Sequence, residues 1–184
     1  MKYLINSSKK GQKIVASVNF DKDLIVISTG GTFNKIYNPI SGELDIDQTS
    51  NAIKEIAQKW LCEFKLINII GKDSLKMSDE DRKILVQTIQ NQKAKKILII
   101  HGTDTIDQSA KVVSAKIRDK IIVFVGAMVP FAIDEVEATA NFALGVGFLQ
   151  GKPKDGVYIA MHSIVKSWDK IIKDKEAGVF KETS

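Results

Sequence analysis

Short β-branched runs alternate along the chain with amphipathic segments, and this alternation limits the possible folds more than any other feature. The runs cover residues 24–28, 64–70, 97–101, 121–125 and 157–161. Three of them are almost continuously apolar, which is typical of strands that are covered on both faces. Strands that alternate with helices in this way predict a parallel sheet with helices on both of its faces.

The segments between the runs carry helical signals. Apolar residues recur at helical spacing from Ile53 to Leu61 and again from Ile106 to Ile117. Ser78–Asp81 resembles a capping box that opens a third helix. Residues 134–150 predict a fourth helix, rich in small side chains. We therefore expect one three-layer α/β domain over residues 24–184, Rossmann-like or flavodoxin-like, with a parallel sheet.

Residues 1–23 do not follow this alternation. Two short apolar stretches, 3–5 and 14–18, flank a Lys-Lys-Gly-Gln turn signal. This pattern predicts a separate N-terminal extension that forms a β-hairpin.

Charge and cysteine content exclude several classes of protein. The net charge is +5, but the lysines are dispersed and only Arg82 and Arg118 are arginines, so we expect no nucleic-acid partner. The single cysteine, Cys62, allows no intrachain disulfide and no multi-cysteine metal site, and we expect no metal and no cofactor. No apolar run is long enough for a membrane span or a secretory signal, which predicts a cytoplasmic protein without a membrane partner.

Polar and glycine-rich loops follow the predicted strands. They cover residues 28–33, 71–74, 101–105, 126–130 and 162–163, with Lys173 a little further on. Ligands of open parallel sheets bind beyond the carboxyl ends of the strands, so these loops are expected to meet at one crevice. The first loop shows no periodic element as far as Gln48, and we interpret it as a mobile lid or a local insertion.

Two kinds of chemistry suit the first loop. Gly31 lets the backbone approach a ligand closely, and the Thr32 hydroxyl could act as a nucleophile. Asp104 and Lys173 could then supply a base, while backbone amides near Thr32 and Thr103 hold the developing oxyanion. Alternatively, Gly-Gly-Thr could form a nest for a phosphate, although neither a Walker motif nor a Gly-x-Gly-x-x-Gly pattern is present.

Three motifs together resemble the bacterial-type L-asparaginase/glutaminase family. They are Ser28–Phe33, His101–Thr105 and Val125–Pro130, in this order and each after a predicted strand. The resemblance runs from about Leu24 to the end of the sequence and covers the N-terminal, active-site domain of that family. It implies an amidohydrolase that uses a threonine nucleophile to convert the side-chain amide of L-asparagine, or a related small amide, to the acid and ammonia.

The resemblance also implies roles for individual residues. Thr32 matches the threonine nucleophile, Thr103 and Asp104 match a Thr-Asp pair whose carboxylate binds the substrate α-amino group, and Lys173 matches the catalytic lysine. Tyr37 corresponds to a lid tyrosine that helps to activate the nucleophile.

Further residues match substrate contacts. Ser74 matches the serine that binds the α-carboxylate, and Gly31 lies beside the nucleophile in the substrate-binding turn. Ala127 lies in the loop whose backbone carbonyl meets the side-chain amide.

The sequence departs from the family at two points. Leu75 stands where the long enzymes often have a glutamine that contacts substrate. The long enzymes also have a C-terminal domain, from which a neighbouring subunit adds a glutamate and an asparagine to each site, and nothing here resembles it. An alternative function is therefore an amino-acid-binding module with little or no activity, and a third is the ammonia-supplying part of an amidotransferase. By analogy with the family, we expect a homo-oligomer, a dimer or a tetramer.

Ordinary structural roles compete with the functional ones. Thr103 and Asp104 could form the N-cap of the following helix, and Lys173 could be a solvated lysine. His101 and His162 are expected to be satisfied core histidines rather than ligands.

Overall fold

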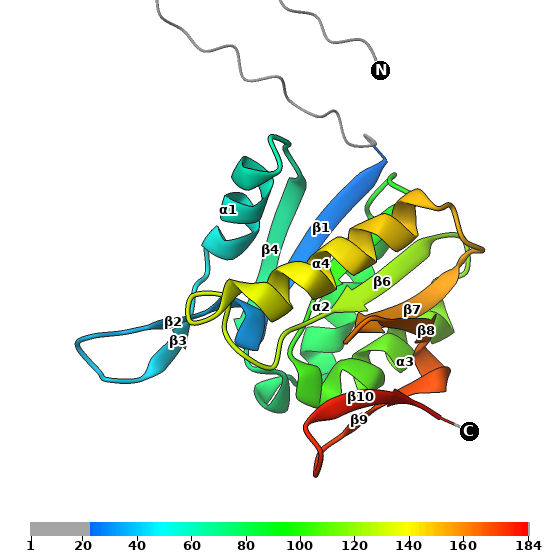
Figure 1. The fold of residues 1–184 in the computed structure, drawn as a ribbon. Coiled ribbons are helices and arrows are strands. Elements are labelled where there is room, and N and C mark those ends of the chain that lie inside the picture. Colours follow the sequence, from blue (N-terminus) through cyan, green and yellow to red (C-terminus); the bar gives the residue numbers. More distant parts are fainter. Residues whose placement is uncertain (1–22, 184) are drawn as a thin grey trace, which may run out of the picture.

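A six-stranded sheet forms the centre of the molecule (Figure 1). The computed structural model describes residues 23–183. The strand order is β4-β1-β5-β6-β7-β8, and the first five strands are parallel. Their bounds are β1 Leu24–Gly30, β4 Lys65–Lys72, β5 Lys96–Ile100, β6 Ile121–Val125, β7 Gly156–Met161 and β8 Ile164–Ser167. The predicted three-layer α/β fold is confirmed.

Strand β8 runs antiparallel to β7, which the sequence did not predict. His162 and Ser163 both have positive φ angles, 49° and 66°, and they reverse the chain within two residues. A turn this short can join only antiparallel strands. The sheet is therefore mainly, and not wholly, parallel.

Helices cover both faces of the sheet. α1 (Asn51–Lys59) and α4 (Glu135–Gln150) pack on one face, and α2 (Asp79–Gln90) and α3 (Ile106–Lys116) pack on the other (Figure 1). Successive residues of a strand point to opposite faces, so Val26 joins the core under α1 and α4 while Ile27 joins the core under α2 and α3. Both residues are fully buried, which explains why the strand sequences are apolar throughout.

The four predicted helices are all present, and their ends have local causes. The Ser78 side chain accepts a hydrogen bond from the Asp81 amide, and the Asp81 carboxylate accepts one from the Ser78 amide, which confirms the predicted capping box. Asp134 caps α4 by accepting from the Val136 amide. These bonds satisfy amide groups that an isolated helix leaves unpaired.

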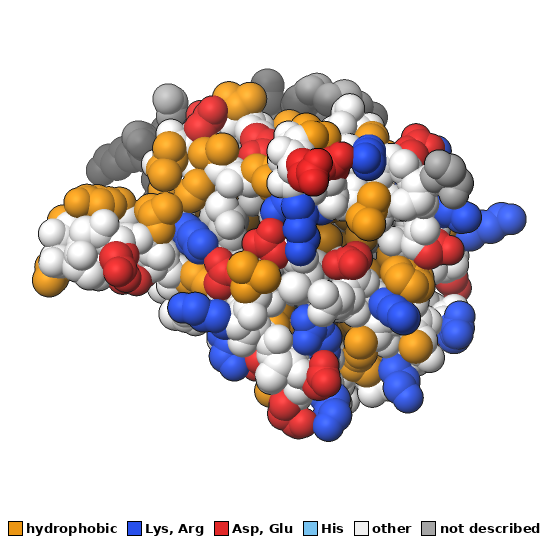
Figure 2. Space-filling model, turned by 90° about the horizontal axis from the view of Figure 1, so that it is seen from below, with side chains coloured by type: hydrophobic (Ala, Val, Ile, Leu, Met, Phe, Trp, Pro, Cys, Tyr) orange, Lys and Arg blue, Asp and Glu red, His pale blue; other side chains and the backbone are white. Residues whose placement is uncertain are grey.

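Two short hairpins extend the fold beyond the predicted elements. β2 (Lys35–Tyr37) pairs with β3 (Leu44–Ile46) within the predicted long loop, and β9 (Ile171–Asp174) pairs with β10 (Val179–Glu182) near the C-terminus. The first hairpin projects from the body at the left of Figures 1 and 2, and apolar side chains gather on it in Figure 2. Strands of three or four residues are too short to show a period in the sequence.

The predicted N-terminal hairpin lies outside the described residues, and the boundary between residues 23 and 24 stays a prediction. Within residues 23–183, no helix is both long and apolar enough to cross a membrane.

Candidate functional site

Glycines bring the loops after β1, β4 and β5 into contact. Gly31 has a φ of 78°, and a Cβ atom at this position would lie 2.4 Å from the Gly102 nitrogen. A Cβ atom on Gly102 would in turn lie 2.6 Å from the Ser74 Oγ. Real Cβ atoms do not approach other atoms this closely, so glycine is required at both positions. The three loops therefore meet, as the sequence predicted.

The loop after β6 joins the same cluster. A Cβ atom on Gly126 would lie 3.0 Å from the Cγ2 atom of Thr103 and 2.6 Å from the carbonyl oxygen of His101. Ala127, the next residue, is fully buried. The close approach of Gly126 places the predicted amide-binding loop directly beside the Thr103 turn.

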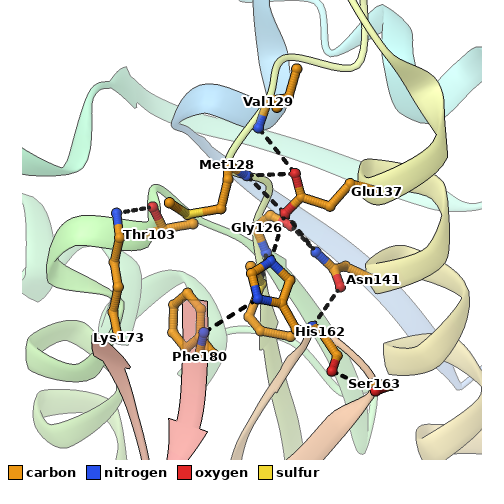
Figure 3. Close-up of polar contacts among 11 residues, drawn as sticks. Thr103, Gly126, Met128, Val129, Glu137, Asn141, His162, Ser163, Lys173 and Phe180 are labelled. Atoms are coloured by element: carbon orange, nitrogen blue, oxygen red, sulfur yellow. Dashed lines mark hydrogen bonds and ion pairs between the residues drawn. The ribbon is translucent and has the colours of Figure 1, made fainter. Parts of the chain in front are cut away.

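Lys173 reaches this cluster from β9. Its Nζ donates hydrogen bonds to the Thr103 Oγ1, at 2.9 Å, and to the Asp104 Oδ1, at 2.7 Å. Figure 3 shows the long lysine side chain directed at Thr103. Only 13% of the Lys173 side chain is exposed, so it is not a solvated surface lysine. An amine held by a carboxylate and a hydroxyl in a half-buried position can orient that hydroxyl and accept or return a proton.

Asp104 and Lys173 also line a cavity of about 230 Å³. Ile171, Ile172 and Phe180, which belong to the β9–β10 hairpin, form its apolar wall. Its lining also includes Asp107, Gln108 and Lys175 but neither Thr32 nor Ser74, so the cavity lies beside the cluster and not between the proposed nucleophile and the proposed carboxylate-binding serine.

Ser74 has a buried hydroxyl whose Oγ finds no hydrogen-bond partner within residues 23–183. The Ser74 carbonyl accepts from the Thr105 Oγ1 at 2.9 Å, which holds the residue against the Thr103–Thr105 turn. Buried hydroxyls are nearly always paired. The Ser74 Oγ lies against Gly102, so a ligand can bond to it only when the Gly102 loop moves aside.

Thr32 begins a short 3₁₀ turn, Thr32–Asn34, directly after the Gly31 contact, and it is half-buried. Tyr37 is not part of the buried cluster, because it lies on β2 of the projecting hairpin and is 63% exposed. The structure therefore brings Gly31, Ser74, Thr103 and Lys173 together and leaves Tyr37 outside.

A buried polar network under the Gly30–Thr32 turn was not predicted. The Asn34 Nδ2 donates to the Ser28 Oγ at 2.9 Å, and the Gly30 carbonyl lies 3.4 Å from the same nitrogen. The Ser50 Oγ lies 2.8 Å from the Ser28 Oγ. These bonds fix the turn from below. Ser28 belongs to a recognisable motif, but no sequence signal links Asn34 or Ser50 to it.

Glu137 and Asn141 of α4 hold the loop that contains Ala127. The Met128 amide donates to both carboxylate oxygens of Glu137, at 2.9 and 3.0 Å, and the Asn141 Nδ2 donates to the Gly126 carbonyl at 3.1 Å (Figure 3). Sequence reasoning missed both residues. The only signal was an acidic residue in the first turn of a predicted helix, where it also favours the helix dipole.

The prediction that His101 is a core histidine with both ring nitrogens satisfied holds only in part. The residue is buried, and its Nδ1 lies 2.8 Å from the Gly102 carbonyl oxygen, but its Nε2 has no hydrogen-bond partner among the described residues. The prediction of a satisfied histidine is therefore wrong for this nitrogen. Burial lowers the pKa of His101 to about 4, so the ring is neutral near pH 7. In the described part of the chain, no three His, Cys, Asp or Glu side chains cluster so as to hold a metal ion.

Fold and site together define a three-layer α/β domain with a hydroxyl, carboxylate and amine cluster at the carboxyl ends of its strands. Residues 23–175 match the family model described as "Asparaginase, N-terminal". The chain belongs to this asparaginase family, which confirms the resemblance found in its motifs. A search of curated proteins finds no significant match.

Solved structures show the same fold. The thermostable L-asparaginase from Thermococcus kodakarensis is 23% identical with a TM-score of 0.76, and the match covers 86% of this chain and 50% of that one. A probable cytoplasmic L-asparaginase from Campylobacter jejuni is 25% identical with a TM-score of 0.74, and the match covers 86% of this chain and 53% of that one. L-asparaginase I from Vibrio cholerae is 19% identical with a TM-score of 0.70, and the match covers 88% of this chain and 51% of that one. The chain thus spans about half the length of these proteins.

Proposed function

We propose that this protein is an amidohydrolase that converts the side-chain amide of L-asparagine, or of a related small amide, to the acid and ammonia. The observation that carries the proposal is the position of Lys173. Its Nζ donates hydrogen bonds to both Thr103 and Asp104, which lie about 70 residues earlier in the sequence. Family membership supports the same reaction.

In the proposed mechanism, Thr32 is the nucleophile. Its Oγ attacks the carbon of the side-chain amide, and its proton passes to the base formed by Lys173 and Thr103, with Asp104 orienting the amine. Backbone amides near Thr32 and Thr103 stabilise the negative charge on the amide oxygen. The proton then returns to the leaving nitrogen, so that ammonia departs and an acyl-enzyme ester remains. Water hydrolyses this ester to the acid and frees Thr32.

Other residues bind the substrate. The unpaired Ser74 hydroxyl donates to the α-carboxylate, and the Asp104 carboxylate accepts from the α-ammonium group. Gly31 leaves room for the backbone to approach the substrate, and the Ala127 carbonyl accepts from the side-chain amide. Tyr37 contacts Thr32 when the β2–β3 hairpin closes over the site. The proposed reaction uses no cofactor.

The test is ammonia release by the purified full chain from asparagine, glutamine and other small amides. Thr32→Ala is expected to lower kcat at least about a thousandfold, because the nucleophile is lost. Thr49→Ala, an exposed threonine on the surface, serves as the matched control and is expected to behave like the wild type. A wild type that is silent over the whole panel, or full activity in Thr32→Ala, would contradict the proposal.

A second candidate is an amino-acid-binding module with little or no turnover. Two observations favour it: the chain spans about half of the structures it matches, and Leu75, at the position of the expected glutamine, is 68% exposed. This function predicts that asparagine or aspartate raises the midpoint of thermal unfolding while no ammonia appears.

A further inference from the structure

The orientation of the Ala127 carbonyl is set by Glu137. The Met128 amide donates to both carboxylate oxygens of Glu137, and the Val129 amide donates to one of them at 3.1 Å. The Ala127–Met128 peptide is trans and planar, so its carbonyl points in the direction opposite to its N–H. With the N–H held on the carboxylate, the Ala127 carbonyl must point away from that carboxylate. A charged acceptor on the N–H also makes the carbonyl of that peptide a stronger acceptor.

His162 extends this contact toward the C-terminal hairpin. Its Nε2 lies 3.1 Å from the Glu137 Oε1, and its Nδ1 accepts from the Phe180 amide at 3.2 Å (Figure 3). A neutral imidazole has one donor and one acceptor. Because Nδ1 accepts, the proton must be on Nε2, which faces the carboxylate, so a single tautomer satisfies both contacts. The rings of His162 and Phe180 also pack edge to face, with centroids 5.9 Å apart.

Phe180 lies directly opposite Lys173 in the β9–β10 register. The strand that pairs with the Lys173 strand is therefore attached to His162 at the level of the lysine itself. Asn141 adds a second connection, because its Nδ2 donates to the Gly126 carbonyl and its Oδ1 accepts from the His162 amide at 3.0 Å. These contacts form one continuous path from the Ala127 loop to the lysine.

We propose that Glu137 and His162 are positioning residues that act as one unit, aiming the Ala127 carbonyl at the substrate amide and holding the β9–β10 hairpin so that Lys173 reaches Thr103 and Asp104. Each side chain acts through another group, Glu137 through the Met128 amide and His162 through the Phe180 amide. This inference rests on the proposed function, since it assigns a purpose to the Ala127 carbonyl and to Lys173. It explains why an acidic helix residue and a histidine from a reversed turn meet beside the site.

The first experiment replaces Glu137 with glutamine in the full chain. The loss of one acceptor oxygen breaks part of the amide contacts, so the backbone amide resonances of Met128, Phe180 and Lys173 are expected to shift. Because a carbonyl displaced by about 1 Å can cost a hundredfold in rate, we expect KM for asparagine to rise and kcat/KM to fall about tenfold to a hundredfold. Glu135→Gln, on the same helix turn but paired with Lys59 at the surface, is the matched control and is expected to change neither.

The second experiment separates the two contacts of His162. In His162→Asn the amide oxygen can still accept from the Phe180 amide, whereas the side chain is too short to reach Glu137. In His162→Gln the longer side chain can donate to Glu137. Because the direct bond to the Phe180 amide remains in the Asn variant while the link to Glu137 is lost, we expect the Phe180 and Lys173 amides to shift less in it than in His162→Gln. We expect the Met128 amide to keep its wild-type shift in the Gln variant. Asparagine also tolerates the positive φ of this position, so circular dichroism must show that the Gln variant is folded.

The outcomes distinguish the inference from the proposed function. Unchanged Phe180 and Lys173 amides in folded Glu137→Gln and His162→Gln would overturn the positioning unit, and so would a proton found on the Nδ1 of His162 by nitrogen NMR. These readouts do not need turnover. Absence of ammonia release by the wild type would contradict the proposed function alone.

Discussion

At the scale of single residues, His101 makes stability depend on pH. Burial lowers its pKa in the folded chain to about 4, against a usual value of 6.5, so the unfolded chain binds a proton between these values that the folded chain does not. The contribution of His101 to the free energy of unfolding is therefore fully present above about pH 6.5. It is lost as the pH falls toward 4, by roughly 3 kcal/mol. Urea unfolding between pH 4 and 7 measures this slope.

His101→Asn provides the comparison, because its amide nitrogen can still donate to the Gly102 carbonyl but does not titrate. The variant is expected to have a clearly smaller slope than the wild type over the same interval. Equal slopes would mean that the imidazole of His101 charges in the folded chain as easily as in the unfolded one.

Individual site residues were predictable when they belonged to a motif. Thr103 and Asp104 follow a strand in a recognisable order, and Lys173 was expected from the family resemblance. Glu137 and His162 were not predicted as partners, because their meeting depends on where α4 lies over the sheet and on a two-residue reversal after β7. Such a contact depends on tertiary packing, which no local pattern encodes.

At the scale of elements, two glycines of α4 have opposite expected effects. Gly147 is exposed, and a Cβ atom there would meet nothing within 4 Å. Gly147→Ala is expected to stabilise the fold by up to about 1 kcal/mol, because alanine loses less backbone entropy in a helix. Gly145 faces the sheet, where a Cβ atom would lie 2.6 Å from Leu98 and 2.8 Å from Val125.

Gly145→Ala is therefore expected to destabilise the fold by about 1–3 kcal/mol, since overpacking outweighs the gain in helix propensity. Denaturant unfolding of both variants tests the close packing of α4 on the sheet. Equal stabilisation by the two substitutions would show that the helix lies further from β5 and β6 than the structure places it.

The central strands and helices were predictable because each contains enough residues to show a period or a cap. Three or four residues in each strand of a hairpin do not, and both hairpins were missed for this reason. The β2–β3 hairpin depends instead on turn chemistry, in which the Asn38 side chain accepts from the Ile40 amide and Gly42 adopts a φ of 74°.

At the scale of the whole molecule, the order of the strands explains the place of the site. The chain moves from β1 to the neighbouring β4 on one side and then continues with β5, β6 and β7 on the other. The carboxyl ends of β1 and β5 therefore adjoin the point where the winding changes direction, and ligands of such sheets bind there. Gly31 and Gly102, which follow these two strands, make the close contact of the candidate site.

The surface beside the site predicts self-association. Large apolar side chains are exposed on the β2–β3 hairpin, including Ile40 at 96%, and also before and within the first turn of α4 at Ile133 and Val136. Between them lies a cavity of about 430 Å³ that is lined by Ile36 and Ile133 and by charged side chains such as Lys35 and Glu55. Exposed apolar side chains rimmed by polar ones are typical of protein interfaces, and the family resemblance predicts a homo-oligomer.

We expect sedimentation velocity over a dilution series to show a dimer or tetramer at micromolar concentration. Ile133→Lys with Val136→Lys is expected to weaken the association constant at least about tenfold, because two charges would have to be buried in an apolar contact. Ile84→Lys makes the same kind of change at an exposed position of α2, on the other side of the sheet, and should leave association unchanged. A monomer at every concentration would contradict the prediction, and loss of association in Ile84→Lys alone would place the interface on the opposite face.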